Sequence, residues 1–266
     1  MISSPKILWL FAIIFVLLLT GSFVKLRTDR QKVAGSETSS QKTVHGIILP
    51  HHKLAEELIL TSFEKLRDSD YSYIVIFGPN HFVPEANSIV TAKVIDGSSF
   101  DNPLMEKFLH EYPDVLVSDE IADKEHSISL HLPYIKEYFP EAKVLPFIIS
   151  PFAGRSDLDE KIVFLTSILP TDTLFIASVD FAHNVNVDLG IKNNEESAQS
   201  INSFDFQNIL RFKDDHLDSP LSIYLLLKSM QNFNSTSWEN WYSSHSAILE
   251  GDPAIQGTSY LIGVFR

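Results

Sequence analysis

The sequence predicts a layered α/β/α domain with a central, mostly buried mixed sheet, preceded by an N-terminal transmembrane helix. Short apolar runs rich in β-branched residues, such as Val44–Pro50 and Tyr73–Gly78, have the composition of buried strands. They alternate with segments such as Leu54–Leu66, in which apolar residues recur near helical spacing. This alternation is typical of a sheet covered by helices. Ahead of the first strand, Ile7–Val24 contains no charged residue.

The N-terminal apolar segment divides the chain into four parts. Its eighteen residues approach the ~20 that a helix needs to cross a bilayer, and they exceed the ~7–15 residues of a secretory h-region. We expect a short tail at 1–6, a retained anchor at 7–24, a polar linker at 25–43 and one α/β domain at 44–266. A cleaved signal peptide is the alternative for 7–24. Basic residues flank both ends of this segment, so the sequence leaves the membrane side of the domain open.

The elements after the second strand continue the alternation. A hairpin is expected within 82–96, where SIVTAKVI alternates in polarity. Pro133 indicates a first turn or a kink, and Pro146 indicates a place near a sheet edge or a strand end. The expected helices are Asn102–Tyr112, Ile128–Phe139, Leu158–Leu169, Glu195–Leu210 and Pro220–Met230, and the expected strands are Lys143–Ile149, Leu174–Val179 and Ser259–Phe265.

Composition excludes several classes of protein. Because the 266 residues include no cysteine, a disulfide scaffold, a thiol nucleophile and an iron–sulfur cluster are excluded. The chain has 21 basic and 34 acidic residues, and residues 1–43 hold six of the basic and two of the acidic ones, so the domain carries a net charge of −17. Nucleic-acid binding needs lysines and arginines against the phosphates. We therefore expect no nucleic-acid partner.

Histidines follow three of the predicted strands. His51 ends the first, His81 follows the second, and Asp180 and His183 follow the strand Leu174–Val179. In α/β sheets, ligands bind in the crevice outside the carboxyl ends of the strands. Three neutral imidazoles suit iron, copper, zinc or nickel and leave coordination positions open. The pattern predicts a metal site made of the three histidines.

Two further residues are candidates for catalysis. Asp180, three residues before His183, is placed to hydrogen-bond a ligand imidazole or to bind the metal, and its alternative is a loop-capping role. His126 opens a predicted helix within Glu125-His126-Ser127, and histidine titrates near neutrality, which suits acid–base work. The alternative is that Glu125 and Ser127 only cap this helix. We take His126 and Asp180 as the candidate catalytic residues.

Four motifs occur in a recognisable order along the domain. They are PHH after the first strand, GPNH after the second, then EHSISLHLPY and SVDFAH, and the chain closes with GTSYLIGVF. In this order and spacing they resemble the Memo family, known in prokaryotes as AmmeMemoRadiSam system protein B. The resemblance covers about 44–266 and implies a fold related to that of class III extradiol dioxygenases.

The resemblance also implies a cofactor. Memo proteins are described as binding iron or copper through three histidines, and the matching motifs put these ligands at His51, His81 and His183. Family members often carry a Cys-Gly pair shortly before a helix that starts with proline, whereas this chain has HLDS before Pro220. His216 falls near the position of that cysteine. It is either a fourth ligand or a solvated loop residue.

Three functions stay open at this point. The first is a non-haem Fe(II) or copper oxidoreductase of dioxygenase type, acting on a small-molecule or peptide substrate that the sequence does not identify. The second is a metal- or peptide-binding module without turnover. The third is a zinc-dependent hydrolase, which is less favoured because the sequence offers no clear second carboxylate as general base.

Overall fold

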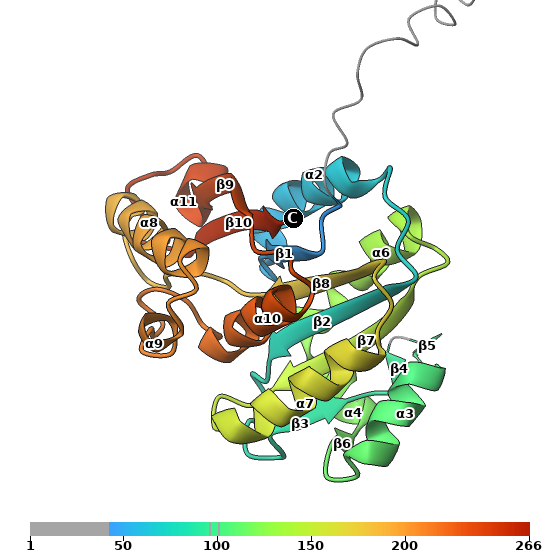
Figure 1. Cartoon of the computed structure of the whole chain (residues 1–266). Helices are drawn as coiled ribbons and strands as arrows, with labels where there is room; N and C mark the ends of the chain where they lie inside the picture. Colours follow the sequence, from blue (N-terminus) through green and yellow to red (C-terminus); the bar gives the residue numbers. More distant parts are fainter. Residues whose placement is uncertain (1–42, 96, 101) are drawn as a thin grey trace, which may run out of the picture. The chain divides into compact units, whose positions relative to one another are not determined.

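The computed structural model describes residues 43–95, 97–100 and 102–266. Thr43–Arg266 forms one compact unit, and within it helices cover both faces of a mixed sheet (Figure 1). The predicted layered α/β domain is therefore confirmed. The predicted membrane span at 7–24 lies outside the described residues. Among those that are described, no helix has the length and apolar character needed to cross a bilayer.

Eight strands form the main sheet in the order β6-β3-β7-β2-β8-β1-β10-β9. The four strands β7, β2, β8 and β1 run parallel, β10 and β9 add antiparallel strands beside β1, and β3 is antiparallel to β7. The strands are β1 (Gly46–Leu49), β2 (Tyr73–Pro79), β3 (Ile89–Thr91), β6 (Leu116–Val117), β7 (Lys143–Ile149), β8 (Thr173–Ser178), β9 (Trp238–His245) and β10 (Ser259–Phe265), with β4 (Val94–Ile95) and β5 (Ser98–Ser99) in a separate hairpin.

The helices divide between the two faces of the sheet. The face with α3, α7 and α10 also receives residues from α8 and α9, and the other face is covered by α2, α4, α5 and α6. The helices are α2 (Glu56–Leu66), which follows the 3-10 turn η2 (Lys53–Ala55), α3 (Pro103–Glu111), α4 (Asp119–Lys124), α5 (His126–Ser129), α6 (Leu132–Tyr138), α7 (Arg155–Ile168), α8 (Val187–Asn202), α9 (Phe206–Ile209), α10 (Pro220–Asn232) and α11 (Ser246–Leu249).

The alternation of side chains along the central strands explains this division. In β2, Val75 and Phe77 join the apolar cluster under α7 and α10, while Ile74 and Ile76 join the cluster under α2 and α5. A parallel strand that is buried on both faces needs apolar residues at every position. The run YIVIF meets this requirement, and so the sequence was sufficient to predict β2.

Two predicted boundaries were wrong for a physical reason. The helix expected at Glu195–Leu210 is divided into the short α9 and the longer α8. Helix α8 ends at Asn202 and begins eight residues before Glu195, where Oδ1 of Asn186 accepts the backbone N–H of Leu189 (2.9 Å). Its buried face carries glycine, asparagine and serine, so apolar periodicity does not mark it. The hairpin expected within 82–96 lies later, between β4 and β5, and Gly97 (φ +73°) is in its turn.

The two prolines had different outcomes. Pro133 lies in the first turn of α6, as predicted, and the expected helix Ile128–Phe139 is split before it into α5 and α6. Pro146 lies in β7, an interior strand, so the expected edge or strand-end position was wrong. The pairing of β7 with β3 involves only Ile148 and Ile149, which leaves Pro146 outside that ladder.

Gly78 in β2 allows α5 to approach the sheet. A Cβ at this position would lie 2.4 Å from Oγ of Ser127 and 2.9 Å from its Cβ, so even an alanine side chain would collide. The contact matters for the site because α5 begins at His126.

We predict that Gly78→Ala lowers the free energy of unfolding by about 1–3 kcal/mol, because the added methyl group overpacks the contact between β2 and α5. Urea unfolding of the purified protein measures this change. Gly154→Ser is the control, since a Cβ there meets nothing closer than 4.0 Å and serine is favoured at the start of α7. Equal stability of wild type and Gly78→Ala would contradict the prediction.

Candidate metal centre

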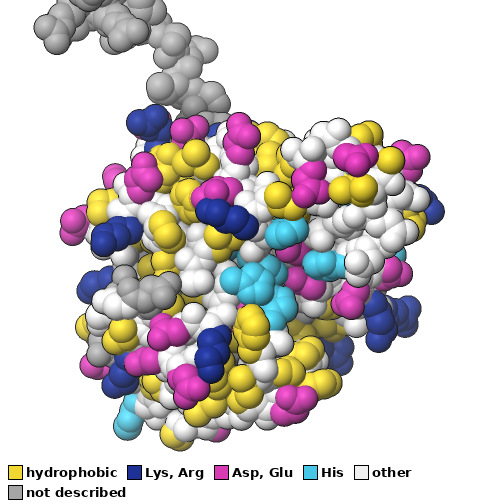
Figure 2. All heavy atoms as spheres, turned by 180° about the vertical axis from the view of Figure 1, so that it is seen from behind, with side chains coloured by type: hydrophobic (Ala, Val, Ile, Leu, Met, Phe, Trp, Pro, Cys, Tyr) yellow, Lys and Arg dark blue, Asp and Glu magenta, His cyan; other side chains and the backbone are white. Residues whose placement is uncertain are grey.

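The carboxyl ends of three neighbouring strands bring the predicted ligands together. Because β2, β8 and β1 are adjacent in the sheet, the residues that follow them lie at one edge. His51 follows β1, His81 follows β2, and Asp180 and His183 follow β8. Figure 2 shows histidine side chains gathered in a patch on one face of the molecule, with acidic side chains beside them.

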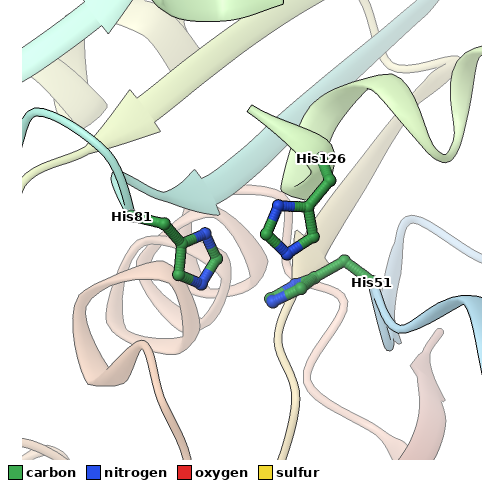
Figure 3. Close-up of side chains that lie close together, drawn as sticks. All are labelled: His51, His81 and His126. Carbon is green, nitrogen blue, oxygen red and sulfur yellow. The ribbon is translucent and has the colours of Figure 1, made fainter. Parts of the chain in front are cut away.

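Three of these imidazoles form a compact group. His51, His81 and His126 each offer a ring nitrogen, and these nitrogens lie within 4.8 Å of one another, the arrangement of a possible metal site (Figure 3). The ring centroids are 5.1 Å apart for His51 and His81 and 4.7 Å apart for His81 and His126. The side chain of His51 is buried, whereas that of His126 is 48% exposed. The candidate acid–base residue is therefore next to the predicted ligands and open to solvent.

Asp218 is the residue that sequence reasoning missed. Its Oδ2 lies 3.0 Å from Nε2 of His51, 3.8 Å from Nε2 of His81 and 3.9 Å from Nε2 of His183. The three predicted ligands thus direct the same ring atom toward one carboxylate oxygen. Both carboxylate oxygens of Asp218 are buried and lack a partner with hydrogen-bond geometry among the described residues.

The chain before α10 holds Asp218 against the end of β8. Leu217 forms an antiparallel bridge with Phe181, and the backbone N–H of Asp218 donates to the carbonyl of Asp180 (3.1 Å). Ser219 and Pro220 then start α10, with Oγ of Ser219 as the cap. The Ser-Pro start of α10 can be recognised in the sequence. It was the signal that could have drawn attention to Asp218, the residue just before it.

Opposite charges offset the burial of these groups. Burial disfavours the charged carboxylate of Asp218, but the imidazoles of His51, His183 and His81 outweigh it and hold the pKa of Asp218 well below its usual range. Burial likewise opposes the charged form of His81, yet the carboxylates of Asp218 and Glu125 raise its pKa to about 10. The buried carboxylate of Asp218 therefore favours positive charge on the groups around it.

Each predicted ligand has a partner at its second ring nitrogen. Nδ1 of His51 lies 3.2 Å from Oγ of Ser178, and Nδ1 of His81 lies 2.8 Å from Oε1 of Glu125. Nδ1 of His183 lies 3.2 Å from Oγ1 of Thr258. Metal-bound histidines nearly always donate this second N–H to a partner, which fixes the ring.

His126 differs from these three residues. Its Nδ1 is 3.6 Å from Oε1 of Glu125, beyond hydrogen-bond distance. The ring of His126 thus lies close to the other imidazoles, but its Nδ1 lacks the hydrogen bond that orients each of them.

Comparison with known proteins identifies the family. The family model for "Memo-like protein" matches residues 25–248. The chain belongs to the Memo family. The resemblance seen in the four sequence motifs is thereby confirmed.

The Memo relatives are distant and are matched over part of their length. A MEMO1 family protein of Aquifex aeolicus is 27% identical over 157 residues, covering 56% of this chain and 42% of the relative. Protein MEMO1 of Rattus norvegicus and that of Homo sapiens are each 21% identical over 175 residues, covering 62% of this chain and 59% of each relative. The chain thus spans about half the length of these relatives.

One solved structure is similar in outline. It is the uncharacterized protein JW3007 from Escherichia coli K12, with a TM-score of 0.48 and 10% identity, covering 82% of this chain and 99% of that one.

The structure shows that His216, which falls near the position of the Memo cysteine in sequence, does not join the site. It bonds to Glu196 (Nε2 to Oε2, 3.2 Å) and lies 3.1 Å from Asp215 through Nδ1. It stacks on Phe212 rather than facing the other imidazoles. The acidic side chain two residues later, Asp218, is the one that enters the site.

Asp180 and Glu125 hold the ligand-bearing backbone in place. Oδ1 of Asp180 accepts the backbone N–H of His51 (3.0 Å), and its Oδ2 lies 3.8 Å from Nε2 of the same residue. The buried Glu125 accepts the backbone N–H groups of His81 (2.9 Å) and Ser127 (3.1 Å). Glu125 thus caps α5, as the second interpretation of its motif expected, and it also bonds His81; the acid–base role of His126 stays a prediction.

We predict that Glu125→Gln lowers the free energy of unfolding of the metal-free protein by about 1–3 kcal/mol near pH 6, because an amide cannot accept both hydrogen bonds from His81. The folded-state pKa of His81, about 10, lies above its ordinary 6.5. The stability that this pair contributes is therefore complete below pH 6.5 and is lost as the pH rises through 10. Urea unfolding at about pH 6 and about pH 9.5 measures the difference between wild type and variant.

The exposed Glu141 provides the control for this experiment. Glu141→Gln should change stability by no more than about 0.5 kcal/mol at either pH. A difference between wild type and Glu125→Gln that stays constant from pH 6 to pH 9.5 would show that the charge on His81 does not contribute to it.

Proposed function

We propose that this Memo protein binds a redox-active transition metal, with Fe(II) favoured, through His51, His81, His183 and Asp218. The observation that carries the proposal is the buried carboxylate of Asp218, which has no hydrogen-bond partner among the described residues and faces three Nε2 atoms. A metal ion offers such a carboxylate and such imidazoles a common partner. The fixed Nδ1 atoms favour His183 over His126 as the third nitrogen ligand.

The chemistry of the donor set supports Fe(II) over Cu(I). Imidazole and carboxylate donors together suit Fe(II), whereas Cu(I) is selected by thiolate and thioether ligands, and the chain has no cysteine. Histidines with one carboxylate and open positions are the donor set of non-haem Fe(II) oxygenases. Bound Fe(II) would supply the one-electron chemistry that a dioxygenase-type reaction requires.

The remaining residues have supporting roles in this proposal. His126 lies outside the proposed ligand set and is half exposed, so it can exchange a proton with a substrate at the mouth of the site. Asp180 positions His51 through the backbone N–H of that residue. The exposed ring of Phe82 lies 6.0 Å from that of His126 and offers an apolar surface to a small-molecule or peptide substrate.

A zinc-dependent hydrolase is the second candidate. The sequence lacked an evident general base, but Oδ2 of Asp180 lies 3.8 Å from Nε2 of His51, close to any ion bound there. A carboxylate in this place can accept a proton from water activated by zinc. The identity of the bound metal separates this candidate from the first.

We predict that the full chain, purified anaerobically in mild detergent, contains one iron ion per molecule by plasma mass spectrometry. His51→Ala, His81→Ala, His183→Ala and Asp218→Asn should each lower metal affinity at least about tenfold, because each removes a donor. His216→Ala and His126→Ala are the matched controls and should keep the metal. Full metal in Asp218→Asn would remove the basis of the proposal.

Two further results of this experiment are informative. Zinc in place of iron favours the hydrolase, and a metal-loaded protein that consumes no oxygen with catechols favours a binding module without turnover. A metal content that falls in His126→Ala and not in His183→Ala would replace the proposed third ligand with the compact group of Figure 3.

We also propose that residues 7–24 anchor the domain to a membrane, supported by their eighteen uncharged residues. The full chain should then stay in the membrane pellet after alkaline carbonate extraction, and deletion of 7–24 should release it. Intact mass distinguishes the alternative, because a cleaved signal peptide would shorten the mature chain.

A further inference from the structure

The hydroxyl of Ser178 lies between two buried imidazoles. Ser178 is the last residue of β8 and is fully buried. Its Oγ is 3.2 Å from Nδ1 of His51 and 2.9 Å from Nε2 of His131. These are the polar partners that the described part of the chain gives this hydroxyl. His131 is fully buried and lies between α5 and α6.

A serine hydroxyl has a single proton, so it can donate to one of these imidazoles only. If it donates to Nδ1 of His51, then neutral His51 carries its proton on Nε2, the atom that faces Asp218, and that atom cannot bind a metal. If it donates to Nε2 of His131, it accepts from Nδ1 of His51, and Nε2 of His51 is free. The direction of this one hydroxyl therefore decides whether His51 is a ligand.

Metal binding through Nε2 of His51 requires the second arrangement, because a neutral imidazole that binds through Nε2 carries its proton on Nδ1. His131 must then be neutral, with its own proton on Nδ1. Burial, with a contribution from His51, lowers the pKa of His131 to about 3, so its ring is neutral and Nε2 can accept a proton. Its Nδ1 is buried with no hydrogen-bond partner among the described residues. A leucine in this place would leave no such polar atom without a partner, so the buried imidazole costs the fold stability.

We propose that His131 is a positioning residue that acts through Ser178: it accepts the serine proton and so holds His51 with Nδ1 protonated and Nε2 free for the metal. This inference rests on the proposed metal site. It differs from the arrangement at His81, whose Nδ1 faces the carboxylate of Glu125. The hydrogen bonds that run from His51 through Ser178 to His131 orient His51. They do so without adding a fourth buried carboxylate to Glu125, Asp180 and Asp218.

The test compares His131→Leu with His131→Gln in the full chain. The leucine cannot accept the serine proton, so the hydroxyl turns to His51 and metal affinity should fall about 10–100-fold. The glutamine carbonyl can accept it, so most of the affinity should return. Affinity is measured with Fe(II) anaerobically and with Zn(II) as a second probe, in competition with a chelator.

Thermal unfolding of the metal-free proteins gives the readout that a structural role would not produce. A residue needed only for packing would lower the unfolding temperature and the affinity together. For a positioning residue, metal-free His131→Leu should unfold at the wild-type temperature or above it while its affinity falls. Nitrogen-15 spectra of the Zn(II)-loaded wild type should show the proton of His51 on Nδ1.

Three outcomes decide the inference. Wild-type affinity in His131→Leu would overturn it, and a wild type that binds no metal would instead overturn the proposed function. If His131→Leu does not fold, Ser178→Ala is used, because it breaks the same chain by removing one oxygen atom. Ser178→Ala should show a comparable loss, and full affinity in that variant would also overturn the inference.

Discussion

The parallel pairing of β8 with β2 on one side and with β1 on the other determines the rest of the site. It places three carboxyl ends next to one another, so the side chains after them meet although they are far apart in sequence. The pairing is fixed because these strands are buried on both faces. A slip of one residue would exchange the two apolar faces, and with them the direction in which each histidine leaves the sheet.

The second requirement of the site at the carboxyl ends of these strands is that its buried charges balance. Burying a carboxylate or an imidazolium alone is costly, and removing one partner of a buried pair leaves the other without compensation. Here Asp218 is surrounded by His51, His81 and His183, and Glu125 is paired with His81. Asp218 and the three histidines, which compensate one another in the metal-free protein, are also the donors proposed for the metal. Stability of the fold and affinity for a metal are therefore coupled at this edge.

The sequence predicted the parts of this structure that depend on local pattern. Continuous apolar runs predicted β2 and β8, the residues just after the strands included His51, His81 and His183, and the start of a predicted helix indicated His126. Adjacency of the strands depends on non-local pairing, which a single sequence does not display. Asp218 was missed because it stands in an acidic loop that resembles a solvated one. His131 was missed because its role depends on Ser178, 47 residues later.

The position of β10 has a consequence for biosynthesis. This final strand lies between β1, the first strand of the domain, and β9, and Thr258 just before it contacts His183. While residues 257–266 are still inside the ribosome, β1 lacks one of its neighbours and His183 lacks its partner Thr258. The proposed metal site can therefore form only after residues 258–265 have been synthesised and can fold. An ion would therefore enter an already folded domain, so its identity would depend on the metals available where that domain folds.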